Sequence, residues 1–366
     1  MPWTLRPAWV VAAATAILVS GCGGTRSDVA RTSTSASTTS QQPGVPPPTP
    51  VKAPPGVVGI ATPSFPVDIV PAGNAVWVFP HHVAFAYRVD PAKNRVIAAV
   101  NLGEASCTSA AAGGGLVWTS NCGSGENEPA WVYGIDPAKN RVSIRVRGTN
   151  PVVGDRSLWV VDDSGKWVRR VDPRTGVVLA RIATHSDQRP GGGTLVLGGV
   201  GYGSAWLDSD ADKTVTRIST ATNKVTAVIP LPGGKTQDEA FSHLSATGSG
   251  YINGAWMAFA DGKAWLGNPA GLFEINARND RVRLIPLAMN PFTEWGDIPV
   301  VAGAGSIWIR TADTRVDRID PATGRVIGVY RAADDGGGGG LAVAFGSLWV
   351  DNAGTGSVWR EPLKSS

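Results

Sequence analysis

Residues 75–78 read Ala75-Val76-Trp77-Val78, and an apolar-Trp-apolar stretch of this kind occurs seven times in the chain. The repeated tryptophans are Trp77, Trp118, Trp159, Trp206, Trp265, Trp308 and Trp349. Consecutive copies are separated by 41, 41, 47, 59, 43 and 41 residues, and about 41 residues make one blade of a β-propeller. The spacing therefore predicts an all-β fold, a seven-bladed β-propeller of four-stranded antiparallel blades. We interpret the tryptophans as blade packing rather than as stacking platforms for sugar or nucleic acid.

A second motif, Asp-Pro-x-x-Asn or Asp-Pro-x-x-Gly, follows the tryptophan in four of the repeats. Near copies begin at Asp90, Asp136, Asp172 and Asp320, and looser versions span 219–224 and 276–281. The fifth residue of each copy is Asn, Asp or Gly, the types that most readily adopt positive φ, and Val follows two residues later. This pattern is typical of a hairpin turn between the two outer strands of a blade. We therefore interpret the aspartates of the motif as structural.

The two ends of the repeat region predict how the ring closes. In the first blade we expect strands at 67–70, 75–79, 84–89 and 96–102, and in the last at 341–344, 347–351 and 357–360. The last blade thus lacks a fourth strand. Val57-Val58-Gly59-Ile60-Ala61 reads like an outer strand, so we expect this amino-terminal strand to complete the last blade. Closure removes an unpaired sheet edge, and a closed ring needs no second subunit, so we expect a monomer.

The amino terminus predicts export. Arg6 precedes an uncharged apolar run from Val10 to Val19, which is too short for a membrane-spanning helix but suits a signal peptide. The run ends in Val19-Ser20-Gly21-Cys22, which resembles the lipobox of bacterial lipoproteins. The resemblance implies a signal peptide at 1–21, cleavage before Cys22 and lipidation of that residue. We expect the mature chain to be anchored to the outer face of the cell membrane, or on its periplasmic side.

Residues 22–56 are dominated by Ser, Thr, Gln, Pro and Gly. Such a segment buries too little apolar surface to offset its ordering entropy, so we expect a disordered tether. With a length of about 5–6 Å times the square root of the residue number, it would hold the domain at 57–366 roughly 30 Å from the lipid. The formal charge of the whole chain is only +4, which favours neither nucleic acid nor a strongly anionic membrane surface as a partner.

Cys107 and Cys122 flank the turn Gly113-Gly114-Gly115 at equal distances. The symmetry predicts that the two cysteines lie directly opposite each other on antiparallel strands of the second blade. Because thiol pairs in exported proteins are usually oxidised, we expect a disulfide between them, and metal binding by the two thiols alone is the weaker alternative.

The repeats Gly-x-Leu-Trp-Val, as at 346–350, and Arg-Ile-Asp-Pro-x-Thr-Gly-x-Val, as at 318–326, resemble those of YVTN/NHL-like propellers and the related streptogramin (virginiamycin B) lyases. The resemblance covers Val57 to about Pro362 and rests on scaffold motifs. It implies the fold, but this group includes interaction propellers, sensor domains and a few metal-dependent enzymes, so the fold does not give the activity.

The lyase resemblance implies a Mg²⁺ near the propeller axis and a histidine base. The His and Glu set of the lyases does not map onto this chain residue by residue. The catalytic candidates are His243, Glu239 and Glu294, since a histidine near carboxylates can act as a tuned base. The simpler interpretation is that they are surface polar residues in long loops.

In a propeller, the loops from second to third strands and the connections between blades share one face. On this chain we expect that face to be acidic and to form the ligand-binding surface. Its candidate residues are His81, His82, Asp162, Asp163, Asp208, Asp210, Asp212, Asp297 and Arg310. No cofactor is required by the sequence, but the face suits a divalent cation, Mg²⁺ or Ca²⁺. Residues 208–212 alternate acids like a calcium loop but lack its sixth-position Gly and twelfth-position Glu.

Two functions follow as hypotheses. The first is a non-catalytic, membrane-tethered module that binds a protein, a peptide or a cell-envelope polymer through this face. It is favoured because the chain contains no group of residues whose spacing matches that of a catalytic set. The alternative is a metal-dependent carbon-oxygen lyase or lactone hydrolase that uses His243 and Glu239. A quinone-cofactor propeller is disfavoured because its blades carry a different tryptophan motif.

Overall fold

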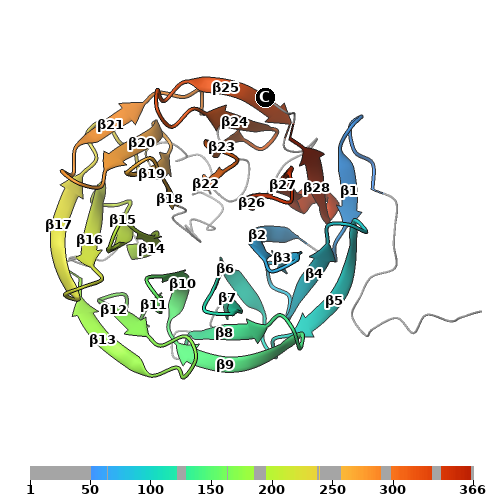
Figure 1. The fold of residues 1–366 in the computed structure, drawn as a ribbon, viewed down its shortest axis with the longest axis horizontal. Coiled ribbons are helices and arrows are strands. Elements are labelled where there is room, and N and C mark those ends of the chain that lie inside the picture. Colours follow the sequence, from blue (N-terminus) through green and yellow to red (C-terminus); the bar gives the residue numbers. More distant parts are fainter. Residues whose placement is uncertain are drawn as a thin grey trace, which may run out of the picture. The chain divides into compact units, whose positions relative to one another are not determined.

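The computed structural model describes residues 51–63, 65–121, 129–162, 164–184, 195–236, 239, 257–289, 298–331 and 339–363. These residues form seven four-stranded antiparallel sheets arranged in a ring (Figure 1), which confirms the predicted seven-bladed β-propeller. Between β27 and β28 the chain forms a 3₁₀ turn, Ala353–Thr355. Within the described ranges, no helix has the length and apolar character needed to cross a membrane.

Each blade has the same order of strands from the centre outward. The innermost strands are β2 (Pro66–Ala72), β6 (Ser106–Gly113), β10 (Thr149–Gly154), β14 (Leu195–Gly201), β18 (Met257–Ala260), β22 (Val300–Gly303) and β26 (Leu341–Ala344). The second strands are β3 (Ala75–Pro80), β7 (Leu116–Asn121), β11 (Ser157–Val161), β15 (Ser204–Ser209), β19 (Lys263–Asn268), β23 (Ser306–Ala312) and β27 (Ser347–Asn352). The third strands are β4 (Phe85–Asp90), β8 (Trp131–Asp136), β12 (Trp167–Val171), β16 (Thr214–Ser219), β20 (Gly271–Asn276), β24 (Arg315–Ile319) and β28 (Ser357–Pro362). The outermost strands are β5 (Arg95–Asn101), β9 (Arg141–Arg147), β13 (Val178–Ala183), β17 (Lys224–Pro230), β21 (Val282–Ile285), β25 (Val326–Arg331) and, in blade seven, β1 (Val58–Ala61).

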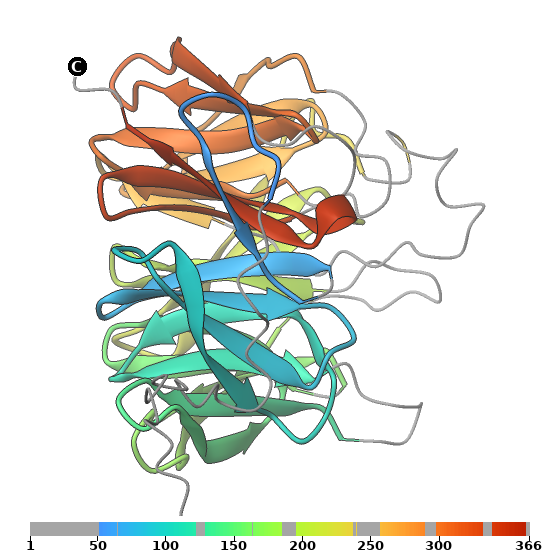
Figure 2. The same ribbon diagram turned by 90° about the vertical axis from the view of Figure 1, so that its right-hand side faces the viewer.

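The ring closes as the sequence predicts. Strand β1 pairs antiparallel with β28, so that Val58 lies opposite Arg360 and Ala61 opposite Ser357 (Figures 1 and 2). The sheet order β1-β28-β27-β26 therefore joins the first strand of the domain to its last three. The chain ends are held in one sheet, and blade seven has no missing strand.

The seven repeated tryptophans form the core, as predicted. All seven are fully buried on second strands, and each indole packs toward the following blade. For example, Trp308 lies in a cluster with Leu341 and Leu348 of blade seven, and its Nε1 donates to the Gly303 carbonyl at 2.9 Å. An aromatic side chain of this size contributes a few kcal/mol through burial, so the repeat supplies much of the contact energy between blades.

An arginine on the third strand accompanies most of these tryptophans, a feature that the sequence analysis missed. The pairs are Arg88 on Trp77, Arg170 on Trp159, Arg217 on Trp206, Arg318 on Trp308 and Arg360 on Trp349, at 5.1–6.0 Å from the ring centre. Four of the five arginines also reach the outer turn of the next blade. Arg360, for instance, donates to the Asn94 side chain at 2.8 Å and to the Pro91 carbonyl. The stack therefore ties blade seven to blade one.

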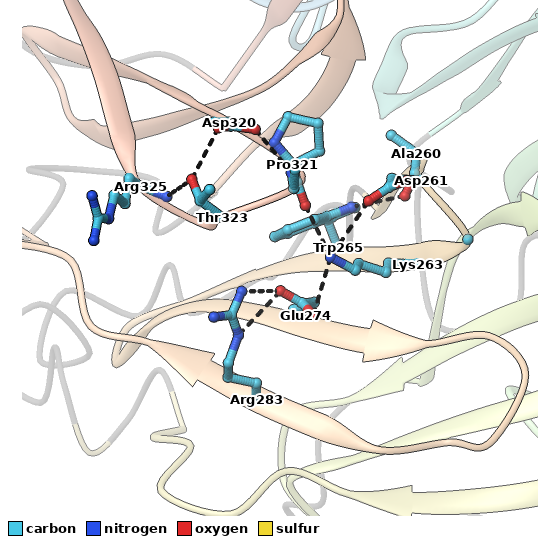
Figure 3. A network of polar contacts seen from close by, with 12 residues as sticks. Ala260, Asp261, Lys263, Trp265, Glu274, Arg283, Asp320, Pro321, Thr323 and Arg325 are labelled. Carbon is cyan, nitrogen blue, oxygen red and sulfur yellow. Dashed lines mark hydrogen bonds and ion pairs between the residues drawn. The ribbon is translucent and has the colours of Figure 1, made fainter.

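Blade five keeps this link with different residues (Figure 3). Trp265 lies opposite Glu274, and Lys263 takes the place of the arginine, with its Nζ 5.4 Å from the indole centre. The same Nζ donates to the Pro321 carbonyl of blade six at 2.9 Å and lies 3.4 Å from Glu274. Arg283 pairs with the other oxygen of Glu274. A cation on the tryptophan and a contact to the next turn are thus retained.

The Asp-Pro motif is structural, as expected. Asp90 accepts hydrogen bonds from the Ala92 and Lys93 amides at 2.8 and 3.2 Å, which closes the turn between β4 and β5. Asn94 and Gly176, at the fifth position of their turns, have φ of 50° and 73°. The turn thus uses its aspartate as a cap and its fifth residue to reverse the chain.

The expected placement of the cysteines directly opposite each other is wrong. Cys107 pairs with Ser120, because a bulge between Cys107 and Ala110 shifts the register by two residues. The side chain of Cys107 and all of Cys122 lie outside the described residues, so the disulfide itself stays a prediction.

Candidate functional site

Connections at one face of the ring differ widely in length. Between blades they range from one residue, Gly148, to the 26 residues 231–256. At the opposite face, the turns joining first to second strands have two residues each. We call the first surface the loop face, defined by the connections between blades and between second and third strands. Turns between third and fourth strands, at the opposite face, have four to six residues. Because length varies far more at the loop face, it is the candidate site.

His81 and His82 lie on the loop face between β3 and β4. Their ring centres are 3.7 Å apart, and His81 is only 8 % exposed. Burial, together with the charge of His82, lowers the pKa of His81 to about 4, so His81 is neutral at pH 7. A neutral imidazole can ligate a metal, but the described part of the chain contains no group of three or more His, Cys, Asp or Glu suited to holding one.

Asp162 closes the loop between β11 and β12. It is buried, and its carboxylate accepts hydrogen bonds from the Ser164 amide and hydroxyl at 3.1 and 2.7 Å. Arg169 and Arg181 form ion pairs with the same carboxylate at 3.6 and 3.3 Å. These contacts make Asp162 a local cap of the loop.

Asp208 and Asp212, in the acidic stretch 208–212, have different surroundings. Asp208 is half-buried, and burial, reinforced by the charge of Asp210, raises its pKa to about 7. Asp212 is exposed and accepts a hydrogen bond from the Ser209 hydroxyl at 2.8 Å. Asp208 can therefore exchange a proton near neutral pH, whereas Asp212 stabilises the turn.

Of the three catalytic candidates, Glu239 lies within the described residues. Its carboxylate pairs with Lys213 at 2.7 Å and accepts the Thr236 amide at 2.9 Å, while the Thr236 hydroxyl accepts the Glu239 amide at 3.0 Å. The hydrogen bond from Lys213 lowers the pKa of Glu239, which favours a carboxylate over a proton donor. The other two candidates, His243 and Glu294, lie outside the described residues, as do Asp163, Asp297 and Cys22. Their roles stay predictions.

Arg310 belongs to the interior of the ring rather than to the loop face where it was expected. It is fully buried on β23, and its Nη1 pairs with the equally buried Asp351 of β27 at 2.9 Å. Its Nη2 donates to the Asp313 carbonyl at 2.8 Å, and the Gly340 amide donates to Asp351 at 2.6 Å. Burial raises the pKa of Asp351 to about 6, against the opposing effect of the Arg310 charge. The pair joins blades six and seven.

Asp68 is a second buried carboxyl group that the sequence analysis did not select. On β2, its two oxygens accept the Ile69 amide at 2.7 Å and the Ala110 amide of blade two at 2.6 Å. Burial raises the pKa of Asp68 to about 7, and the charge of Asp351 adds to the shift. The available signal was an acid inside the apolar stretch Pro66-Val67-Asp68-Ile69-Val70. Because amides or an arginine already occupy these carboxylates, they suit joining blades better than binding metal.

The innermost strands of blades one, two and three each contain a β-bulge. The register shifts between Pro66 and Asp68 in β2, between Cys107 and Ala110 in β6, and between Thr149 and Val152 in β10. Within the second and third bulges, the Asn150 side chain donates to the Ser109 hydroxyl at 3.0 Å. Side-chain hydrogen bonds thus link blades one, two and three at the bulges.

Comparison with known proteins supports the fold alone. No protein-family model matches the chain, and no curated protein matches it. Among solved structures, BamB from Moraxella catarrhalis is 14% identical with a TM-score of 0.49, over 82% of this chain and 83% of that one. The computationally designed Ika8 protein is 9% identical with a TM-score of 0.50, over 82% and 98%. The resemblance to YVTN/NHL-like propellers and streptogramin lyases therefore stays a prediction.

Proposed function

We propose that this chain is an exported, lipid-anchored propeller that binds a protein, a peptide or a cell-envelope polymer through its loop face. The observation that carries the proposal is the large length variation at that face, from one residue to 26 between blades, against turns of two residues between first and second strands and of four to six between third and fourth strands at the opposite face. Rigid scaffolds with one variable face commonly bind through that face. Asp162, Asp212 and Glu239 make hydrogen bonds and an ion pair within the loops of this face, and such contacts hold the loops in the shape that a binding surface needs.

The binding proposal is tested by replacing residues 241–256 with a short Gly-Ser linker, which leaves the contact of Glu239 with Lys213 intact. Chemical crosslinking in whole cells, followed by mass spectrometry, would report the partner. We expect the crosslinked species to disappear in this variant. A matched control inserts a Gly-Ser linker into the Ala304-Gly305 turn at the opposite face and should keep it. Equal crosslinking in both variants would contradict the proposal.

The anchor proposal is supported by the lipobox-like residues Val19-Ser20-Gly21-Cys22. Cys22→Ala should abolish metabolic labelling with a radioactive fatty acid and should move the protein out of the membrane fraction. A variant that remains membrane-bound and labelled would refute lipidation at this residue.

A second candidate function is a metal-dependent lyase or lactone hydrolase resembling the streptogramin lyases. It is favoured by the position of Glu239, which Lys213 and Thr236 orient at the start of the connection that carries His243. Thermal melting after EDTA treatment, then with added Mg²⁺ or Ca²⁺, tests for a metal site, since native-state binding raises the melting temperature. Turnover of a streptogramin or lactone that His243→Ala abolishes would establish the enzyme. No metal-dependent shift and no turnover would exclude this candidate.

A further inference from the structure

Two buried carboxyl groups and one buried arginine lie together where blades six, seven and one meet. Asp68 is on β2, Asp351 on β27 and Arg310 on β23, and all three side chains are buried. Arg310 pairs with Asp351 at 2.9 Å, and its Nη2 donates to the Asp313 carbonyl in the loop between β23 and β24. The charge of Asp351 also acts on Asp68. With both carboxyl groups ionised, the cluster therefore has one negative charge that its arginine does not neutralise.

The surrounding strands supply no second cation to this cluster among the described residues. Strands β22 and β26 have no titratable side chain, and neither does β3. The other titratable side chains on packed strands and adjoining loops are His81, Cys107, Asp313, Arg315, Asp317, Arg360 and Glu361. Arg315 pairs with Asp317 at 2.7 Å, and Arg360 reaches the outer turn of blade one. His81 is neutral at pH 7.

Both carboxyl groups hold the main chain of the innermost strands near the loop face. Asp68 accepts the Ala110 amide in the bulge of β6 at 2.6 Å. Asp351 accepts the amide of Gly340, the residue before β26, also at 2.6 Å. A side-chain carbon added to Gly340 would lie 2.6 Å from the Asp351 carboxylate, so the chain packs directly on this group. The charge state of the cluster thus acts on the starts of β6 and β26.

We propose that Asp68, Asp351 and Arg310 form a proton-dependent switch that controls local opening of β6 and β26 at the loop face. With one proton held by the two carboxyl groups, the cluster is neutral and both strands stay closed. Loss of that proton leaves a buried negative charge, and opening relieves it by admitting water. The switch concerns the chain itself, and only an effect of pH on partner binding would rest on the proposed function.

The direction of the response follows from proton binding. Burial raises the pKa of Asp68 to about 7 and that of Asp351 to about 6, whereas a hydrated aspartate has a pKa near 4. The closed state therefore holds more protons than the open state at pH 6. Opening should become more favourable as the pH rises from 6 to 8.

Hydrogen exchange measured by mass spectrometry tests the switch on the full-length chain in detergent. Exchange rates at pH 6 and pH 8 are first corrected for the intrinsic effect of pH on amide exchange. Protection of β6 and β26 should then fall about tenfold, as expected for one group with a closed-state pKa of about 7. Strand β17 of blade four, which does not contact the cluster, should change by less than about twofold.

Two substitutions test the assignment to these residues. D68N cannot ionise and should lose most of the tenfold change. In D351N the Arg310 charge acts on Asp68 instead, so Asp68 should already be ionised at pH 6 and the change should again be small. D212N, which removes an exposed carboxylate from the loop face, is the matched control and should keep the wild-type response.

Four results would overturn the proposal. Unchanged protection of β6 and β26 in the wild type would mean that the cluster does not control them. A full tenfold change in D68N would assign the response to other groups. The wild-type response in D351N would show that Asp68 titrates independently of Asp351. An equal loss of protection in β17 would indicate destabilisation of the whole ring.

Discussion

At the scale of single residues, the buried carboxyl groups of Asp68 and Asp351 contribute to how the stability of the fold depends on pH. Burial raises the pKa values of both above that of an exposed aspartate, to about 7 and about 6. Between the unfolded pKa, near 4, and these values, the native state holds more protons than the unfolded chain. The free energy of unfolding contributed by these groups therefore falls as the pH rises through this window.

The first prediction concerns Asp68→Asn. For a folded pKa of about 7, the wild type should lose about 2.5 kcal/mol of stability at this site between pH 5 and pH 8. The asparagine variant cannot ionise, so its melting temperature should depend less on pH over the same range. Calorimetry at both pH values measures this difference. Asp212→Asn, at an exposed carboxylate, should leave the wild-type dependence in place. A steep decline that persists in Asp68→Asn would show that other groups cause it.

The second prediction concerns the ion pair of Arg310 with Asp351. Arg310→Leu should destabilise the fold by about 3–5 kcal/mol, because it leaves a buried carboxylate without its cation. The double variant Arg310→Leu/Asp351→Leu should be less destabilised than this single variant, since both charges are then removed. Urea denaturation of the two variants measures the difference. Additive losses would mean that the two side chains do not act as a pair.

At the scale of elements, the tryptophan of the second strand and the arginine of the third act as one unit. The arginine covers the indole and continues to the outer turn of the next blade, where Asn94 or an equivalent residue accepts its hydrogen bond. Arg318 differs, because its described hydrogen bonds go to Ser306 and Ala304 of its own blade. A comparison of Arg360 with Arg318 therefore distinguishes the effect of stacking on a tryptophan from the effect of hydrogen bonds between blades.

The third prediction uses this difference. Arg360→Ala and Arg318→Ala both remove a cation from a tryptophan, at 5.2 and 5.3 Å from the ring centre. Arg360→Ala also removes the bonds from blade seven to blade one, so it should cost about 1–2 kcal/mol more. Chemical denaturation compares the two variants. Equal costs would show that the contact between blades contributes nothing beyond the stack.

At the scale of the whole molecule, strand β1 completes blade seven by pairing with β28, so that the outer edge of β28 is covered. Deletion of residues 1–61 should therefore expose the edge of β28, lower the melting temperature and cause association. Deletion of residues 1–50 removes none of the described structure and should leave both properties unchanged. Melting curves and size-exclusion chromatography test this fourth prediction. A monomeric, equally stable product of the longer deletion would contradict the role of β1 in closure.

The number of blades, the outer turns and the closing strand could all be predicted from the sequence. Each of these depends on local patterns, namely the spacing of tryptophans such as Trp77, the Asp-Pro turns and the orphan strand at residues 58–61. Local patterns predict these features because each blade repeats the same chain geometry.

Which polar residues are buried, and where the strand register shifts, became clear only from the folded chain. Arg310 looked like a surface charge because its partner, Asp351, lies 41 residues away on the next blade. Cys107 was placed opposite Cys122 because a bulge leaves no clear mark in Ser106-Cys107-Thr108-Ser109. Burial, register and edge geometry arise from contacts between neighbouring strands and blades, and no single repeat contains them.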